Sequence, residues 1–135
     1  MRRKEKPTIN RYYHIYNRGV NYQNIFFTQE NWLFFLRRLR HYCTPDKAQI
    51  IAYCLMPNHY HLLVFILTET FGADVMQPLM VSYTKAINKQ EGRVGPLFQG
   101  PYRAKLVASE RHLMHLTRYI HLNPVAAGFV AAPED

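Results

Sequence analysis

The stretch 53–65, read as YCLMPNHYHLLVF, constrains the fold of this chain more than any other. Its Pro-Asn pair at 57–58 is typical of a tight turn, and an apolar run follows that no charge interrupts. On a strand, side chains alternate between faces, so His59 and His61 are expected to point one way and Tyr60 the other. Beyond the histidines both faces are apolar, which predicts a central strand covered on both sides.

Two imidazoles on one face can converge on a single metal ion, and a rigid strand holds such ligands in place. A plain structural pair is the alternative at this stage, because a chain with seven histidines easily contains such a spacing by chance. Polar groups that face a core need a reason to be there. That requirement favours metal binding by His59 and His61.

The rest of the chain alternates between strand and helix patterns. Apolar residues at helical spacing predict three helices, the first capped by Thr28, the second running from Gln77 to before Gly92, and the third stopped by Pro124. Strands are predicted at 11–17, 48–55, 59–67 and 102–107, with a loop at 68–74. The order β-α-β-β-α-β followed by a helix is the ferredoxin-like pattern, an α+β fold with an antiparallel sheet and an added C-terminal helix.

Composition limits the domain count and the kind of partner. A chain of 135 residues, 48% hydrophobic, is expected to form a single domain over 1–135, with 1–10 as a basic N-terminal arm. Lys and Arg number 17 against 9 Asp and Glu, and the formal charge of +8 favours nucleic acid as the partner. No run approaches the length of a membrane span, and two cysteines without CxxC spacing suit a reducing compartment. We therefore expect a cytoplasmic protein without membrane contact.

A polar stripe follows the last predicted helix. His112, His115, Tyr119 and Asn123 recur at i, i+3, i+7 and i+11, which places them along one line of a helix. Tyrosines on amphipathic helices are usually packing residues, so Tyr119 alone would indicate little. Its polar neighbours at helical spacing make it a candidate functional residue.

Three ordered motifs, CLMPNHYHLLV, LFQGPYRAK and RYIHLNPVAAGFV, resemble the HUH single-tyrosine transposases, in particular the REP-associated tyrosine transposases. The opening YHIYNRGVNYQNIF also resembles their first strand, so the resemblance covers residues 11–130. In this family the two histidines bind a divalent metal, a helix tyrosine is the nucleophile, and a polar residue one turn later completes the metal site. The resemblance implies metal binding by His59, His61 and Asn123 and nucleophilic attack by Tyr119, with His115 as an alternative third ligand.

The resemblance implies cleavage and rejoining of single-stranded or hairpin DNA through a covalent 5′-phosphotyrosine. A divalent cation withdraws charge from the phosphate oxygens that otherwise repel a nucleophile. Neutral imidazole and amide ligands with open water positions suit Mg²⁺ or Mn²⁺, although imidazole also accepts Zn²⁺ or Co²⁺. Related enzymes work as dimers, so a homodimer is expected.

Basic residues on the arm, the first strand and the fourth strand are expected to contact the DNA backbone. They are Arg2, Arg3, Lys4, Arg11, Arg18, Arg103 and Lys105. Family members often carry a basic residue where this chain has Pro101 and Ala126, which weakens the expected phosphate contact there. Two other hypotheses stay open: a non-catalytic nucleic-acid-binding module on the same sheet, and an HUH nickase serving replication or plasmid transfer.

Overall fold

The computed structural model describes residues 6–109, 111–112 and 126–128. Its elements in chain order are β1 (Tyr12–Arg18), the 3-10 turn η1 (Val20–Tyr22), α1 (Gln29–Tyr42), β2 (Ala48–Met56), β3 (His59–Ile66), the π-helical turn η2 (Gly72–Met76), α2 (Gln77–Glu91), β4 (Arg103–Leu106) and β5 (Ala126–Gly128). Ser109 caps a helical turn at 111–112 by accepting the backbone N–H of His112 at 3.1 Å. The rest of the predicted third helix lies outside the described residues.

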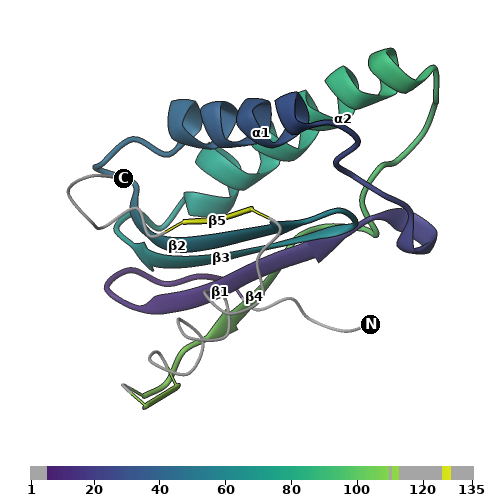
Figure 1. Cartoon of the computed structure of the whole chain (residues 1–135). Helices are drawn as coiled ribbons and strands as arrows, with labels where there is room; N and C mark the ends of the chain where they lie inside the picture. Colours follow the sequence, from purple (N-terminus) through teal and green to yellow (C-terminus); the bar gives the residue numbers. More distant parts are fainter. Residues whose placement is uncertain (1–5, 110, 113–125, 129–135) are drawn as a thin grey trace.

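The strands form one antiparallel sheet in the order β4-β1-β3-β2-β5. The histidine strand β3 is central, between β1 and β2, and a two-residue turn at 57–58 joins it to β2, as predicted. Both long helices lie on one face of this sheet (Figure 1). The predicted α+β class with an antiparallel sheet is confirmed, and β5, which pairs with β2, is an addition that the sequence does not predict.

Local signals set the helix ends. Thr28 Oγ1 accepts the N–H of Asn31 at 3.2 Å and Asn31 Oδ1 accepts that of Thr28 at 3.1 Å, so the predicted cap of α1 is a full capping box. Gly92 ends α2 in the left-handed conformation with φ of 62°. The predicted loop at 68–74 is wrong in its second half, because η2 leads directly into α2 and its residues Val75 and Met76 are fully buried.

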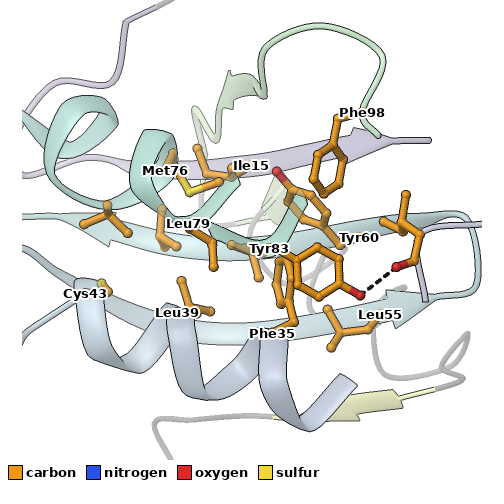
Figure 2. Packing of buried hydrophobic residues seen from close by; sticks show 14 of the residues in the cluster. Ile15, Phe35, Leu39, Cys43, Leu55, Tyr60, Met76, Leu79, Tyr83 and Phe98 are labelled. Atoms are coloured by element: carbon orange, nitrogen blue, oxygen red, sulfur yellow. Dashed lines mark hydrogen bonds between the residues drawn. The ribbon is translucent and has the colours of Figure 1, made fainter. Parts of the chain in front are cut away.

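The main core lies between the sheet and the two helices (Figure 2). Ile15, Tyr60 and Leu62 point from β1 and β3 toward Phe35 and Tyr83 of the helices, and all five are 0% exposed. The opposite face of the sheet carries a smaller buried cluster of Ala52, Cys54, Leu63 and Val107. β3 is therefore covered on both faces in its middle, as the apolar run predicts. No helix in the described part of the chain is long and apolar enough to cross a membrane.

Two buried tyrosines test this account of the core. Tyr83 Oη donates to the carbonyl of Ile25 at 2.6 Å (Figure 2), whereas Tyr60 Oη donates to the weakly accepting sulfur of Met80 at 3.3 Å. Tyr83→Phe leaves a buried carbonyl unpaired, so we expect it to lower the free energy of unfolding by about 1–3 kcal/mol. Tyr60→Phe, the matched control, should cost less than about 1 kcal/mol. Urea denaturation measures both losses, and equal values would contradict the account.

Candidate metal and nucleic-acid site

His59 and His61 begin β3 and face away from the helices. Tyr60 between them is fully buried in the main core, so the alternation of the strand turns both histidines to the opposite face, as predicted. The two imidazole rings are edge to face, with their centroids 5.0 Å apart. Both side chains are half-buried, so the sheet holds them while one side stays open to solvent.

Antiparallel pairing brings basic and aromatic side chains to the histidines. β1 places Tyr16 opposite His61 and Arg18 opposite His59, and β4 places Arg103 opposite Tyr16. Directly opposite residues share a face of a sheet, so these side chains lie together. With two neighbouring polar residues they line a pocket of about 220 Å³. The pocket therefore combines two potential metal ligands with two guanidinium groups.

A larger hollow of about 450 Å³ lies between α1 and the first half of β2. Its lining is mostly apolar, as at Leu36 and Ile50, and Arg40 is the one charged side chain among the described residues that line it. Cys43 also lines the hollow, and burial raises the pKa of its thiol to about 11, so the thiol stays protonated at neutral pH. The described residues that line this hollow include no ionised nucleophile and no histidine, so the smaller pocket at the histidines is the candidate site.

His59 is held by the residue before it. Its Nδ1 lies 2.7 Å from Oδ1 of Asn58, and because an amide oxygen only accepts, Nδ1 carries the proton and donates. The amide nitrogen of Asn58 donates in turn to the carbonyl of Tyr22 at 3.3 Å, which fixes the orientation of the amide. Nε2 of His59 is therefore the nitrogen with the lone pair that a metal requires.

His61 is held by a histidine of the neighbouring strand. Nε2 of His14 and Nδ1 of His61 are 2.7 Å apart, and the two rings stack with centroids 4.9 Å apart. One nitrogen of this pair must donate and the other accept, so at least one ring is neutral. Because Nδ1 of His61 is engaged by His14, the nitrogen that His61 can offer an ion in the pocket is Nε2.

Burial keeps these imidazoles uncharged at neutral pH. It lowers the pKa of His61 to about 3, and repulsion from His14 and His59 adds to the effect. It lowers the pKa of His14 to about 4, with Lys105 and His112 adding to it. Burial also lowers the pKa of His59. A metal ligand must be unprotonated, so the pair meets that requirement at pH 7.

The structure brings some of the predicted DNA-contacting residues to this pocket and not others. Arg18 and Arg103 line it, and Lys105 is exposed two pairs further along β4, opposite His14. Arg11 is exposed at the other end of the sheet, about 20 Å from the histidines at the usual rise per strand residue, so it does not join them.

Several predicted residues cannot be placed. Arg2, Arg3, Lys4, Tyr119, Asn123 and the alternative ligand His115 lie outside the described residues. Over the ranges that the structure does describe, no group of three or more His, Cys, Asp or Glu side chains is arranged to hold an ion. Within that part of the chain, His59 and His61 are the proposed histidine ligands.

Sequence reasoning missed five residues at this site, among them Asn17 and Gln99, which line the pocket. His14, Tyr16 and Asn58 contact the histidine pair or line the pocket, yet none was a candidate. The available signal was the spacing of His14, Tyr16 and Arg18 in the first strand, which puts all three on one face. The pairing partner of that face could not be read from the sequence, because alternation does not set which strands pair.

Comparison with solved structures identifies the fold. A REP-associated tyrosine transposase, solved bound to a REP hairpin, matches with a TM-score of 0.60 and 19% sequence identity, over 93% of this chain and 72% of that chain. A candidate transposase from Deinococcus radiodurans R1 matches with a TM-score of 0.57 and 19% identity, over 93% of this chain and all 100% of the other. At this identity the likeness establishes a shared α+β fold.

The family follows from the sequence match. The family model described as "Transposase IS200 like" matches residues 8–123. The chain therefore belongs to the IS200-like transposase family. Among curated proteins, a search finds no match.

The hydrogen bonds that orient the two histidines can be tested without any ion. Asn58→Ala removes the acceptor of the His59 Nδ1–H, so we expect the tautomer signals of His59 to change in long-range ¹H–¹⁵N spectra while those of His61 stay. His14→Phe should change His61 and leave His59 unaltered, so each variant controls for the other. An unprotonated Nδ1 on His59 in the unaltered protein would contradict the assignment.

Proposed function

We propose that this chain is a metal-dependent transposase that cleaves and rejoins single-stranded DNA beside hairpins. The observation that supports this most is the pocket in which His59 and His61 lie beside Arg18 and Arg103, in a chain of the IS200-like family. The REP-associated tyrosine transposase of the same fold was solved with a REP hairpin, which supports hairpin DNA as the partner. A homodimer acting in the cytoplasm is part of the same proposal.

The donors of the pocket suit a divalent ion. Asn58 leaves His59 with a lone pair on Nε2, and His14 leaves His61 to bind through Nε2. Asn123 is the proposed third ligand, with His115 as the alternative. Neutral nitrogen and oxygen ligands of this kind suit Mg²⁺ or Mn²⁺. Such an ion supplies a double positive charge for the phosphate oxygens, which lowers the barrier to attack at phosphorus.

We assign a positioning role to His14. When His61 binds through Nε2, its Nδ1 carries the proton and donates it to Nε2 of His14, which accepts because His14 is neutral. Metal-ligating histidines are commonly oriented in this way through their second nitrogen, and such partners are worth about 10–100-fold in metal affinity. The role of His14 is therefore to fix the ring of His61 rather than to touch DNA.

Arg18 and Arg103 are placed to bind the phosphate that enters the pocket. A guanidinium group presents two parallel N–H donors that match two phosphate oxygens. Both arginines line the pocket beside the histidines, from β1 and from the start of β4 respectively. They bind and orient the backbone, and their charge offsets that of the phosphate in the half-buried site.

Tyr119 is the proposed nucleophile. Its phenolic oxygen forms a bond to phosphorus while the bond from phosphorus to the 3′ oxygen breaks. The phenol proton passes to a base, for which His115 is the candidate, and the departing 3′ oxygen takes up a proton. The products are a 5′-phosphotyrosine and a free 3′-hydroxyl. Attack by a 3′-hydroxyl on the phosphotyrosine reverses the step, so strands are rejoined without ATP.

Covalent capture of DNA tests this proposal. The protein is incubated with Mn²⁺ and a pool of hairpin oligonucleotides that carry randomised single-stranded flanks, labelled at either end. We expect a denaturation-resistant adduct with the 3′-labelled fragment, release of the 5′-labelled fragment, and loss of both in EDTA. Tyr119→Phe should abolish the adduct, and Tyr42→Phe on the helical face should retain it.

The other outcomes separate the competing functions. Cleavage that persists in Tyr119→Phe without an adduct indicates a hydrolytic nuclease and overturns the transposase proposal. Binding of the oligonucleotides without cleavage by the unaltered protein indicates a non-catalytic nucleic-acid-binding module. An adduct that forms equally well in EDTA contradicts the metal requirement.

A further inference from the structure

The aromatic ring of Tyr22 is exposed to solvent beside the candidate pocket. Tyr22 is 68% exposed, in the short turn η1 that follows β1. Tyrosine combines a flat apolar ring with a polar tip, and it is enriched where proteins contact partners. The turn lies next to the histidine pair, because the Tyr22 carbonyl accepts from Asn58, the residue that orients His59.

The backbone that presents this ring is held in a strained conformation. Asn21 and Tyr22 both have positive φ, 54° and 59°, in the left-handed region that asparagine tolerates but a tyrosine rarely adopts. The turn is also tight, because a β-carbon on Gly19 would lie only 2.0 Å from the carbonyl oxygen of Gln23. Strain of this kind is concentrated at functional sites, where surrounding contacts such as the Asn58 hydrogen bond maintain it.

One face of the ring is covered by a cation that also lines the pocket. The guanidinium carbon of Arg18 lies 3.9 Å from the centroid of the Tyr22 ring, and its Nη1 donates to the Gly19 carbonyl at 3.3 Å. Arg18 lines the same pocket as His59 and His61. The other face of the ring is left open, since most of the side chain is exposed. The result is a flat aromatic surface beside a pocket that carries two guanidinium groups.

We propose that Tyr22 stacks an unpaired nucleobase of the DNA strand whose phosphate enters the pocket, an inference that rests on the proposed function. Stacking of a base on an aromatic side chain tolerates any sequence, because every base has a flat π-face. The charge of Arg18 and Arg103 favours a nucleic acid over an apolar partner, because each nucleotide presents a phosphate next to its base. Tyr22 thus holds the nucleotide that neighbours the cleaved phosphate.

Binding of a labelled single-stranded oligonucleotide, followed by fluorescence anisotropy in EDTA so that no cleavage intervenes, tests the inference. Tyr22→Ala and Tyr22→Leu should weaken binding roughly 5- to 150-fold, and Tyr22→Trp should retain it. Tyr42→Ala is the matched control, because Tyr42 also lies under an arginine, Arg38, but on the helical face, and we expect no change.

Combining Tyr22→Ala in the protein with an abasic nucleotide in the DNA identifies the contacted base. An abasic nucleotide at one position should weaken binding as much as Tyr22→Ala does, and the two changes together should cost little more than either alone. Failure of the unaltered protein to bind single-stranded DNA removes the proposed function together with this inference. Binding that Tyr22→Ala leaves unchanged overturns the inference alone. A change of oligomeric state in Tyr22→Ala also overturns it, because the ring would then be a contact between two copies of the chain.

Discussion

The pairing register of β3 within the sheet is the constraint on which the candidate site depends. Tyr60, Leu62 and Val64 are fully buried toward the helices, and each such side chain is worth about 1.5–3 kcal/mol when buried. A slip of one residue would turn all of them to the opposite face and His59 and His61 into the core. The apolar side of the strand therefore fixes the side on which the imidazoles lie, and the site takes its geometry from the core.

Hydrogen bonds determine which nitrogen of each histidine ring is available to a metal ion. Asn58 holds Nδ1 of His59, and His14 holds Nδ1 of His61, so both rings are left to coordinate through Nε2. The amide nitrogen of Asn58 also donates to the carbonyl of Tyr22. One amide therefore orients both His59, a proposed metal ligand, and the turn that carries the exposed Tyr22 ring. The same few residues therefore orient the proposed binding sites for the ion, the phosphate and the neighbouring base.

Local signals made most of the fold predictable from the sequence, and contacts between distant segments account for what was missed. The capping box at Thr28, the left-handed Gly92 and the alternation around Tyr60 all depend on neighbouring residues, and the structure agrees with each. The role of His14 depends on a partner 47 positions away, which only strand pairing reveals. The predicted loop at 68–74 runs into η2, and the burial of Val75 in that turn is a tertiary contact that local patterns do not reveal.

The central claim is that His59 and His61 together hold one divalent ion, each through Nε2. Anomalous diffraction from crystals grown with Mn²⁺ measures this directly. We predict a single strong peak bonded to both Nε2 atoms, at about 2.1 Å from each, with Arg18 and Arg103 on the same side of the sheet. An ion bound through Nδ1, or bound away from the pair while the two histidines stay without metal, would contradict it.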